Sequence, residues 1–329
     1  MEKAIALMLT LAVMFCGCGE AAGSYVNLAS VEQGYYYTTD SEGNLYFIDG
    51  DAIYSVHDGE LTLLVEASEI LPYKGEATLE QQFVNIAEWY DGCFYAFDSR
   101  DDTIWKYDPA AGTSEQLPVD FTRPKQKHFT GLGITADEIL IFNDQLYLLH
   151  YQTLFVRYDM NTQETTPYYS GWETVLSAVD DNAMYFCRGR EVTREAIDTG
   201  ERLTLEMPPE LEIENSFIYY LFLDGYGDIY YAADTKSGEY QLWRGTTDNS
   251  APCERVALPT ALTSTWFDYN GWLYYRDTDT VWRLNMKNER IELFMPYDGR
   301  TPLLLGGKIC KRAGEMYQFD ILADLDKID

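Results

Sequence analysis

The sequence predicts an all-β fold, because it is rich in aromatic residues, its apolar residues alternate over short runs, and one phrase recurs along the chain. The 329 residues include 27 Tyr and 7 Trp, and aromatic residues make up 15% of the chain. Such residues suit the half-buried, pleated surface of a sheet. The chain is long enough for one large all-β domain or for two domains of average size.

The recurring phrase is a turn followed by an apolar residue and a Tyr. Its copies GNLYFID, GCFYAFD, DQLYLLH, NAMYFCR, GDIYYAAD and GWLYYRD contain Tyr46, Tyr95, Tyr147, Tyr185, Tyr230 and Tyr274. A second apolar segment follows most copies and carries Tyr54, Trp105, Phe155, Trp243 and Trp282 at one repeated position. Gly, Asp and Asn bound the two segments, so we expect them to pair as adjacent antiparallel strands.

Each unit also has room for a strand before the Tyr segment and for another strand after the second segment. In the sixth unit the four strands would be STWFDY, WLYYRD, TVWRLN and RIELFM. Four short strands that recur roughly every 40 to 50 residues are the signature of a β-propeller. We therefore predict a single β-propeller made of four-stranded antiparallel blades.

The number of blades depends on the residues at the two ends of the repeat. Six units account for residues from about 35 to 298, and the tail that follows holds about three strands. Residues 24–30 precede the first complete unit and can supply the strand that the tail lacks. We predict seven blades, with six as the alternative, in a ring closed by the N-terminal strand, because an open ring would leave two unpaired sheet edges.

The first residues differ in composition from the rest of the chain. Lys3 precedes an apolar run, residues 4–17, that is short for a membrane span and matches the core of a secretory signal peptide. The end of this run, with Gly17 directly before Cys18, resembles the lipobox of bacterial lipoproteins, although Phe15 and Cys16 depart from its usual residues.

The lipobox resemblance implies a division of the chain into three parts. These are a signal peptide at residues 1–17, a lipidated Cys18 with a tether at 18–23, and the propeller at 24–329. We expect an extracytoplasmic protein that is anchored to the bacterial cell membrane by the lipid alone. The alternative is an ordinary signal peptide that is cleaved nearby, which would give a secreted protein.

The charge of the chain excludes one class of partner. Lys and Arg number 24 against 54 Asp and Glu, so the formal net charge is -30. Such a field repels phosphate backbones, so we expect no binding of nucleic acid. Cys93, Cys187, Cys253 and Cys310 show no metal-ligand spacing, so we expect free thiols, no metal and no cofactor.

The repeated phrase carries a family resemblance. Tyr-x-x-Asp at Tyr46, Tyr95 and Tyr274 resembles a degenerate YWTD repeat of the low-density-lipoprotein-receptor propellers. The wider phrase resembles bacterial propeller domains of unknown function that are related to that repeat and often occur on surface lipoproteins. The resemblance implies that the repeated acid mainly joins neighbouring blades by hydrogen bonds. The third and fourth units depart from it, with His150 and Arg188 in place of the acid.

Catalytic motifs are missing from the sequence. It contains no G-x-S-x-G, H-E-x-x-H, P-loop or G-x-G-x-x-G pattern. The acids Asp49, Asp98 and Asp277 fall at one repeated position and could form a glycosidase pair. We favour a structural role for them, because a site is made by breaking the symmetry of a repeat.

Interruptions of the repeat are better candidates for function, since long loops on a rigid scaffold often bind ligands. The candidate binding residues are Arg123, Lys125, Lys127, His128, Trp172 and Arg188. Neutralisation of nearby acids is the alternative role for the basic residues among them.

The sequence thus predicts a monomeric, non-enzymatic cell-surface lipoprotein that binds an unknown ligand, a glycan or an envelope protein. Two alternatives remain, an exported polysaccharide hydrolase or lyase with its site in the central funnel, and an envelope assembly scaffold.

Overall fold

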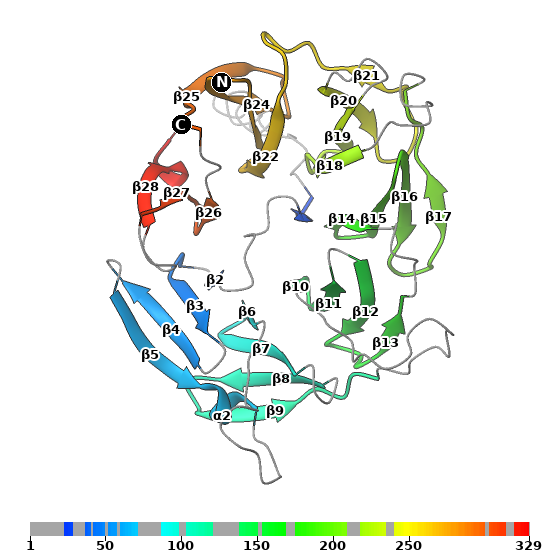
Figure 1. The fold of residues 1–329 in the computed structure, drawn as a ribbon. Coiled ribbons are helices and arrows are strands. Elements are labelled where there is room, and N and C mark those ends of the chain that lie inside the picture. Colours follow the sequence, from blue (N-terminus) through cyan, green and yellow to red (C-terminus); the bar gives the residue numbers. More distant parts are fainter. Residues whose placement is uncertain are drawn as a thin grey trace, which may run out of the picture.

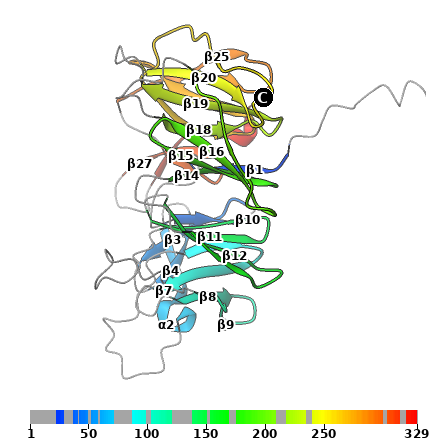
Figure 2. The ribbon, with the colours of Figure 1, turned by 90° about the vertical axis from the view of Figure 1, so that its right-hand side faces the viewer.

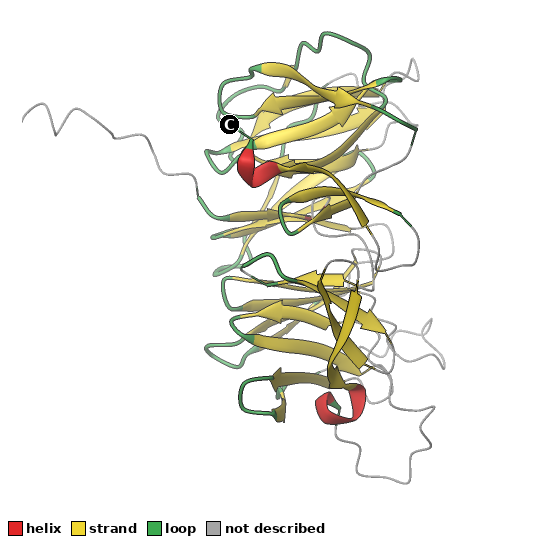
Figure 3. Cartoon of the chain, turned by 90° about the vertical axis from the view of Figure 1, so that its left-hand side faces the viewer, coloured by secondary structure: helices red, strands yellow, loops and turns green. Residues whose placement is uncertain are grey.

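The fold is a seven-bladed β-propeller (Figure 1). The computed structural model describes residues 23–28, 37–40, 42–49, 52–57, 60–71, 87–98, 103–120, 138–150, 153–168, 175–208, 218–234, 240–299, 303–313 and 319–328. Seven antiparallel sheets stand around a central axis. In the two side views the strands cross the thickness of the ring, so the loops collect on its two faces (Figures 2 and 3).

The first four blades follow one another along the chain, and within each of these segments the strands run in order from the axis outward. The first contains β2 (Tyr37–Thr39), β3 (Leu45–Asp49), β4 (Ala52–His57) and β5 (Glu60–Glu66), followed by helix α2 (Ala67–Ile70). The second contains β6 (Ala87–Tyr90), β7 (Cys93–Asp98), β8 (Thr103–Asp108) and β9 (Thr113–Gln116). The third contains β10 (Glu138–Phe142), β11 (Gln145–His150), β12 (Thr153–Asp159) and β13 (Thr165–Pro167). The fourth contains β14 (Val175–Asp180), β15 (Ala183–Arg188), β16 (Glu191–Ala196) and β17 (Arg202–Thr204).

The last three blades complete the ring. The fifth contains β18 (Ile218–Leu223), β19 (Asp228–Asp234), β20 (Tyr240–Thr246) and β21 (Glu254–Arg255). The sixth contains β22 (Ser264–Tyr269), β23 (Trp272–Arg276), β24 (Thr280–Asn285) and β25 (Ile291–Pro296). The seventh contains β26 (Leu303–Leu305), β27 (Lys308–Arg312) and β28 (Phe319–Asp324), followed by the short helix η4 (Leu325–Lys327).

The repeated phrase forms the second strand of each of the first six blades, as predicted. Its Tyr residues are buried, and those of the third, fourth and fifth blades have no exposed surface. Both faces of a blade pack against neighbouring blades, and the described core forms seven apolar clusters, one between each pair of neighbours. This burial on two faces explains why the second strands have apolar runs rather than strict alternation.

The predicted role of the N-terminal strand in closing the ring is wrong. Strand β1 (Tyr25–Asn27) lies inside the ring, where it pairs antiparallel with β14 and becomes a fifth, innermost strand of the fourth blade (Figure 1). The first and seventh blades instead meet through apolar side chains, including Tyr37 and Phe319, whose ring centroids lie 5.4 Å apart. The seventh blade has three described strands, which is the number that the C-terminal tail predicts.

Hydrogen bonds across two blades explain the position of β1. The Asn27 side chain donates to the carbonyl of Leu223 over 3.2 Å and accepts from its N–H over 2.8 Å, so a side-chain amide completes the inner edge of β18. The N–H of Gly23 donates to the carbonyl of Gly225 over 2.7 Å. These partners belong to the fifth blade, so β1, which pairs with the fourth blade, also satisfies backbone groups of the fifth.

The cysteines agree with the prediction of thiols. Cys93, Cys187, Cys253 and Cys310 lie on four different blades and form no disulfide with one another. Within the described ranges, no helix is long and apolar enough to cross a membrane.

Candidate functional site

The centre of the ring contains a cavity of about 630 Å³. Its wall is formed by β1 and by residues of β2, β6, β10, β22 and β26, with the turns that follow β22 and β26. Five blades and the N-terminal segment therefore each contribute a different part of the wall. The volume lies within the range of roughly 300 to 1,000 Å³ that is usual for small-molecule sites.

The cavity wall is anionic. Two charged residues line it, Glu88 of β6 and Asp268 of β22, and its described lining contains no Lys, Arg or His. Thr38, Tyr269 and Asn270 add polar groups. Since the whole chain carries a net charge of -30, no long-range positive field offsets these carboxylates.

Glu88 is oriented by the first blade. The Thr38 hydroxyl of β2 donates to Oε2 of Glu88 over 3.2 Å, and accepts from the backbone N–H of Trp89 over 3.1 Å. The hydroxyl thus links the carboxylate to the backbone of its own strand. The Glu88 carboxylate is therefore held in a defined orientation at the cavity wall.

Asp268 faces the N-terminal strand. Burial raises the pKa of the Tyr25 hydroxyl, and the charges of Asp268 and Asp224 raise it further, as does the hydrogen bond to Asp268. The hydroxyl therefore stays protonated at neutral pH and is a donor toward the Asp268 carboxylate. β1 is in this way part of the site, and it connects the cavity wall to the fourth and fifth blades.

The chemistry of this wall suits binding of a cation or of hydroxyl groups. Carboxylates are acceptors for ammonium, guanidinium and hydroxyl donors, and the Tyr and Asn side chains can donate or accept. No group of three or more His, Cys, Asp and Glu side chains among the described residues has the geometry of a metal site.

A second cavity of about 780 Å³ lies on the fifth blade. It is lined by residues of β20, by Arg255 of β21 and by the connection to the sixth blade. Arg255 is the one charged residue of its described lining. Because one blade and its connection form this cavity alone, we take the central cavity as the candidate site.

Among the binding residues predicted from interruptions of the repeat, Arg188 lies within the described structure. Arg188 ends β15 with an exposed side chain, opposite Glu191 of β16, and it does not line the central cavity. Cys18, Arg123, Lys125, Lys127, His128 and Trp172 lie outside the described residues.

One of the repeated acids, Asp277, stabilises a turn. The carboxylate of Asp277 accepts from the N–H groups of Asp279 and Thr280 and from the indole N–H of Trp282, all at 2.8 to 2.9 Å and all within the sixth blade. These bonds lower the pKa of Asp277 despite its partial burial, which acts in the opposite direction. Asp49, at the end of β3, is exposed, whereas Asp98, at the end of β7, is buried. The three acids therefore have different surroundings and do not form one shared site.

Sequence reasoning missed Glu88 and Asp268. Both lie on innermost strands, in AEWY of β6 and STWFDY of β22, where their direct neighbours in sequence are apolar or aromatic. An acidic residue within an innermost strand could have indicated the site, because the innermost strands of a propeller face its axis. The role of Tyr25 could not be found in this way, because it depends on where β1 docks.

Comparison with known proteins shows similarity in fold alone. No family model and no curated protein matches the sequence. One similar solved structure is the extracellular domain of a putative hybrid two-component system from B. thetaiotaomicron, with 14% identity and a TM-score of 0.47. The match covers 86% of this chain and 34% of that chain, so this chain spans about a third of the length of that extracellular domain.

Two further structures have comparable similarity. A second putative hybrid two-component system from B. thetaiotaomicron gives 13% identity and a TM-score of 0.46, covering 84% of this chain and 37% of that chain. Dipeptidyl peptidase 4 of Porphyromonas gingivalis gives 8% identity and a TM-score of 0.49, covering 89% of this chain and 50% of that chain. At these identities and scores, the assignment of seven blades rests on the strand pairing of this chain itself.

Proposed function

We propose that the protein is an extracytoplasmic, lipid-anchored binding protein, and that its central cavity takes a small organic cation. The proposal of a cationic ligand rests on the cavity of about 630 Å³, because Glu88 and Asp268 are the charged residues of its described lining. A ligand with an ammonium or guanidinium group would form charge-assisted hydrogen bonds to these carboxylates. Its apolar part would lie against Leu140, Ile141 and Leu304.

The N-terminal sequence supports the proposed anchor. Cys18 precedes Gly23 by five residues, and an extended chain of that length spans at most about 18 Å. Gly23 and Ser24 bond to Gly225 and Asp181, in turns that join the first and second strands of their blades. A lipid on Cys18 would therefore hold this face of the ring near the membrane and leave the opposite face directed away from it.

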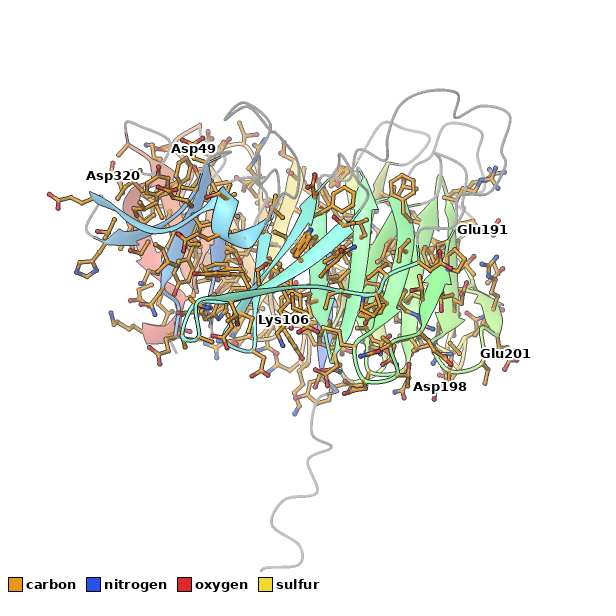
Figure 4. All side chains as sticks on the ribbon, turned by 90° about the horizontal axis from the view of Figure 1, so that it is seen from below. Asp49, Lys106, Glu191, Asp198, Glu201 and Asp320 are labelled. Atoms are coloured by element: carbon orange, nitrogen blue, oxygen red, sulfur yellow. The ribbon has the colours of Figure 1, made fainter. Side chains whose placement is uncertain are left out.

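The ligand class can be tested by calorimetric titration of the purified protein with spermidine, a Lys-containing dipeptide and neutral maltotriose. We expect the two cations to bind, and we expect Glu88→Gln and Asp268→Asn each to weaken that binding by about tenfold or more. Asp198→Asn is the matched control, because Asp198 is an exposed acid in a turn at the perimeter (Figure 4). Its binding should equal that of the unchanged protein.

Other outcomes would change the proposal. Equal losses in all three variants would mean that the cations respond to overall charge and not to the cavity. Binding of maltotriose alone would replace the cation by a neutral glycan. Turnover of a polysaccharide that disappears in Asp268→Asn would establish the hydrolase or lyase alternative.

The anchor is tested separately by metabolic labelling with a fatty-acid analogue. We expect the protein to be labelled, the Cys18→Ser variant to lose the label, and the matched Cys16→Ser variant to retain it. Label that persists in Cys18→Ser would exclude Cys18 as the modified residue.

A further inference from the structure

In the described structure, the third strand of the seventh blade lies at the outer edge of its sheet. Its strand order is β26-β27-β28, whereas the other blades have at least four strands. Among the described residues, no strand pairs with the outer edge of β28. The backbone groups along such an edge are a template for an additional strand.

Apolar side chains beside this edge are exposed. Ile321 of β28 is 60% exposed and Leu63 of β5, in the neighbouring first blade, is 52% exposed. Each lies on the side of its strand that faces the neighbouring blade, since side chains two residues apart lie on one face of a strand. Phe319 and Leu61 are their neighbours on those faces, and both pack in the cluster between the seventh and first blades.

No described strand of the seventh blade covers Leu63 and Ile321. The apolar cluster between the seventh and first blades continues outward to Phe319 and Leu61, which are partly buried, and stops there. Leu63 pairs with Tyr54 across β4 and β5, and Ile321 pairs with Cys310 across β27 and β28, each next to a register shift in its strand pair. A fourth strand in the seventh blade would extend the cluster over both side chains.

We propose that the outer edge of β28 and the adjoining face of β5 bind an extended segment of a partner protein, in which Lys or Arg alternates with apolar residues. The segment would pair with β28 as the fourth strand of the seventh blade. Its apolar side chains would cover Leu63 and Ile321, and its backbone would satisfy the open edge.

Charge indicates which kind of segment fits the outer edge of β28 and the adjoining face of β5. Asp320 is exposed on β28 at the perimeter of the ring (Figure 4), and Glu60 and Glu66 are exposed at the two ends of β5. Lys327 is paired with Asp324, and Lys311 with Asp298. A second copy of the chain would bring another net charge of -30 to this edge, which opposes pairing between copies and favours a basic partner.

Fluorescence anisotropy with labelled synthetic peptides tests the proposal. The probe is KVTVKVTV, compared with its acidic counterpart EVTVEVTV and with KVPVKVPV, in which Pro removes backbone donors. We expect the first peptide alone to bind, with affinity that falls as salt rises. Ile321→Ser and Leu63→Ser should each weaken binding by about tenfold.

Leu293→Ser is the matched control. Leu293 is 62% exposed on β25. Its neighbour on the same face, Ile291, packs in the cluster between the fifth and sixth blades, away from β28 and β5. Equal binding by Leu293→Ser and Ile321→Ser, or no binding of KVTVKVTV to the unchanged protein, would overturn the proposal. Sedimentation that shows a dimer which Ile321→Ser dissociates would also overturn it, because the occupant would then be a second copy.

Discussion

The fourth and seventh blades depart from the four-stranded pattern in opposite ways. The fourth gains β1 on its inner edge, where the strand is buried and bonds to the next blade through Asn27. The seventh has three strands and meets the first blade mainly through apolar side chains. Among the described residues, apolar packing joins the seventh blade to the first, whereas β1 adds hydrogen bonds between the fourth and fifth blades.

The largest effect is expected at Asn27, which is 2% exposed. Asn27→Ala removes both bonds to Leu223 and leaves a buried N–H and a buried carbonyl without partners. We expect a loss of about 3 kcal/mol in the free energy of unfolding, measured by urea denaturation.

The control for Asn27 is Asn249, which makes the same pair of bonds in a more exposed place. Its side chain accepts from the N–H of Glu206 over 2.8 Å and donates to the carbonyl of Thr204 over 3.0 Å. Asn249→Gly removes this pair without straining the positive φ of 59°. A loss as large as that of Asn27→Ala would contradict the importance of burial.

Two glycines give the next effect, one beside β1 and one at the ring junction. A Cβ on Gly225, which has a φ of +75°, would lie 2.8 Å from the carbonyl oxygen of Gly23 and from the ring of Tyr25. A Cβ on Gly306 would lie 3.0 Å from the carbonyl oxygen of Gly43. We expect Gly225→Ala to cost about 2 kcal/mol and Gly306→Ala about 1 kcal/mol, by urea denaturation. The reverse order would show that the junction between the first and seventh blades is the tighter of the two.

A smaller and pH-dependent effect is expected between the sixth and seventh blades. Burial raises the pKa of Tyr269 to about 12, helped by its hydrogen bond to Asp326 over 2.6 Å. The pKa of an unfolded Tyr is about 10, so this stabilisation is complete below pH 10 and is lost as the pH rises toward 12. Urea denaturation from pH 9 to 11 should show a shallower decline for Tyr269→Phe than for the unchanged protein. Parallel declines would mean that the hydroxyl does not couple the two blades.

The smallest effect is expected at the open edge of the seventh blade. Ile321 is 60% exposed, so Ile321→Thr should change the free energy of unfolding by less than about 0.5 kcal/mol. A loss above 1 kcal/mol, by the same denaturation measurement, would mean that Ile321 supports the folded ring itself.

The blades were predictable because each repeats the same local chemistry. Tyr95 and Tyr230, for example, follow a Gly or Asp turn and precede a second apolar segment, and both lie on the second strand of their blades. The count of three strands after residue 298 also followed from the tail alone. Local pattern was sufficient here, since each strand pairs with the next one along the chain.

The place of β1 and the cavity were not predictable by the same means. The segment YVN is compatible with any open sheet edge, and Asn27 bonds to a residue 196 positions away. The hydrogen bond between Tyr25 and Asp268 was not predictable either, because it depends on where β1 docks. The basic residues from Arg123 to His128 stay predictions, because they lie outside the described structure.

The docking of β1 also fixes an order of events during synthesis. Residues 25–27 leave the ribosome early, but their partners in β14 and β18 follow only after about 150 to 196 further residues. The N-terminal segment must therefore wait without its native contacts while three blades are made. Because contacts between distant residues slow folding, we expect the capture of β1 to be a late step that locks blades already assembled.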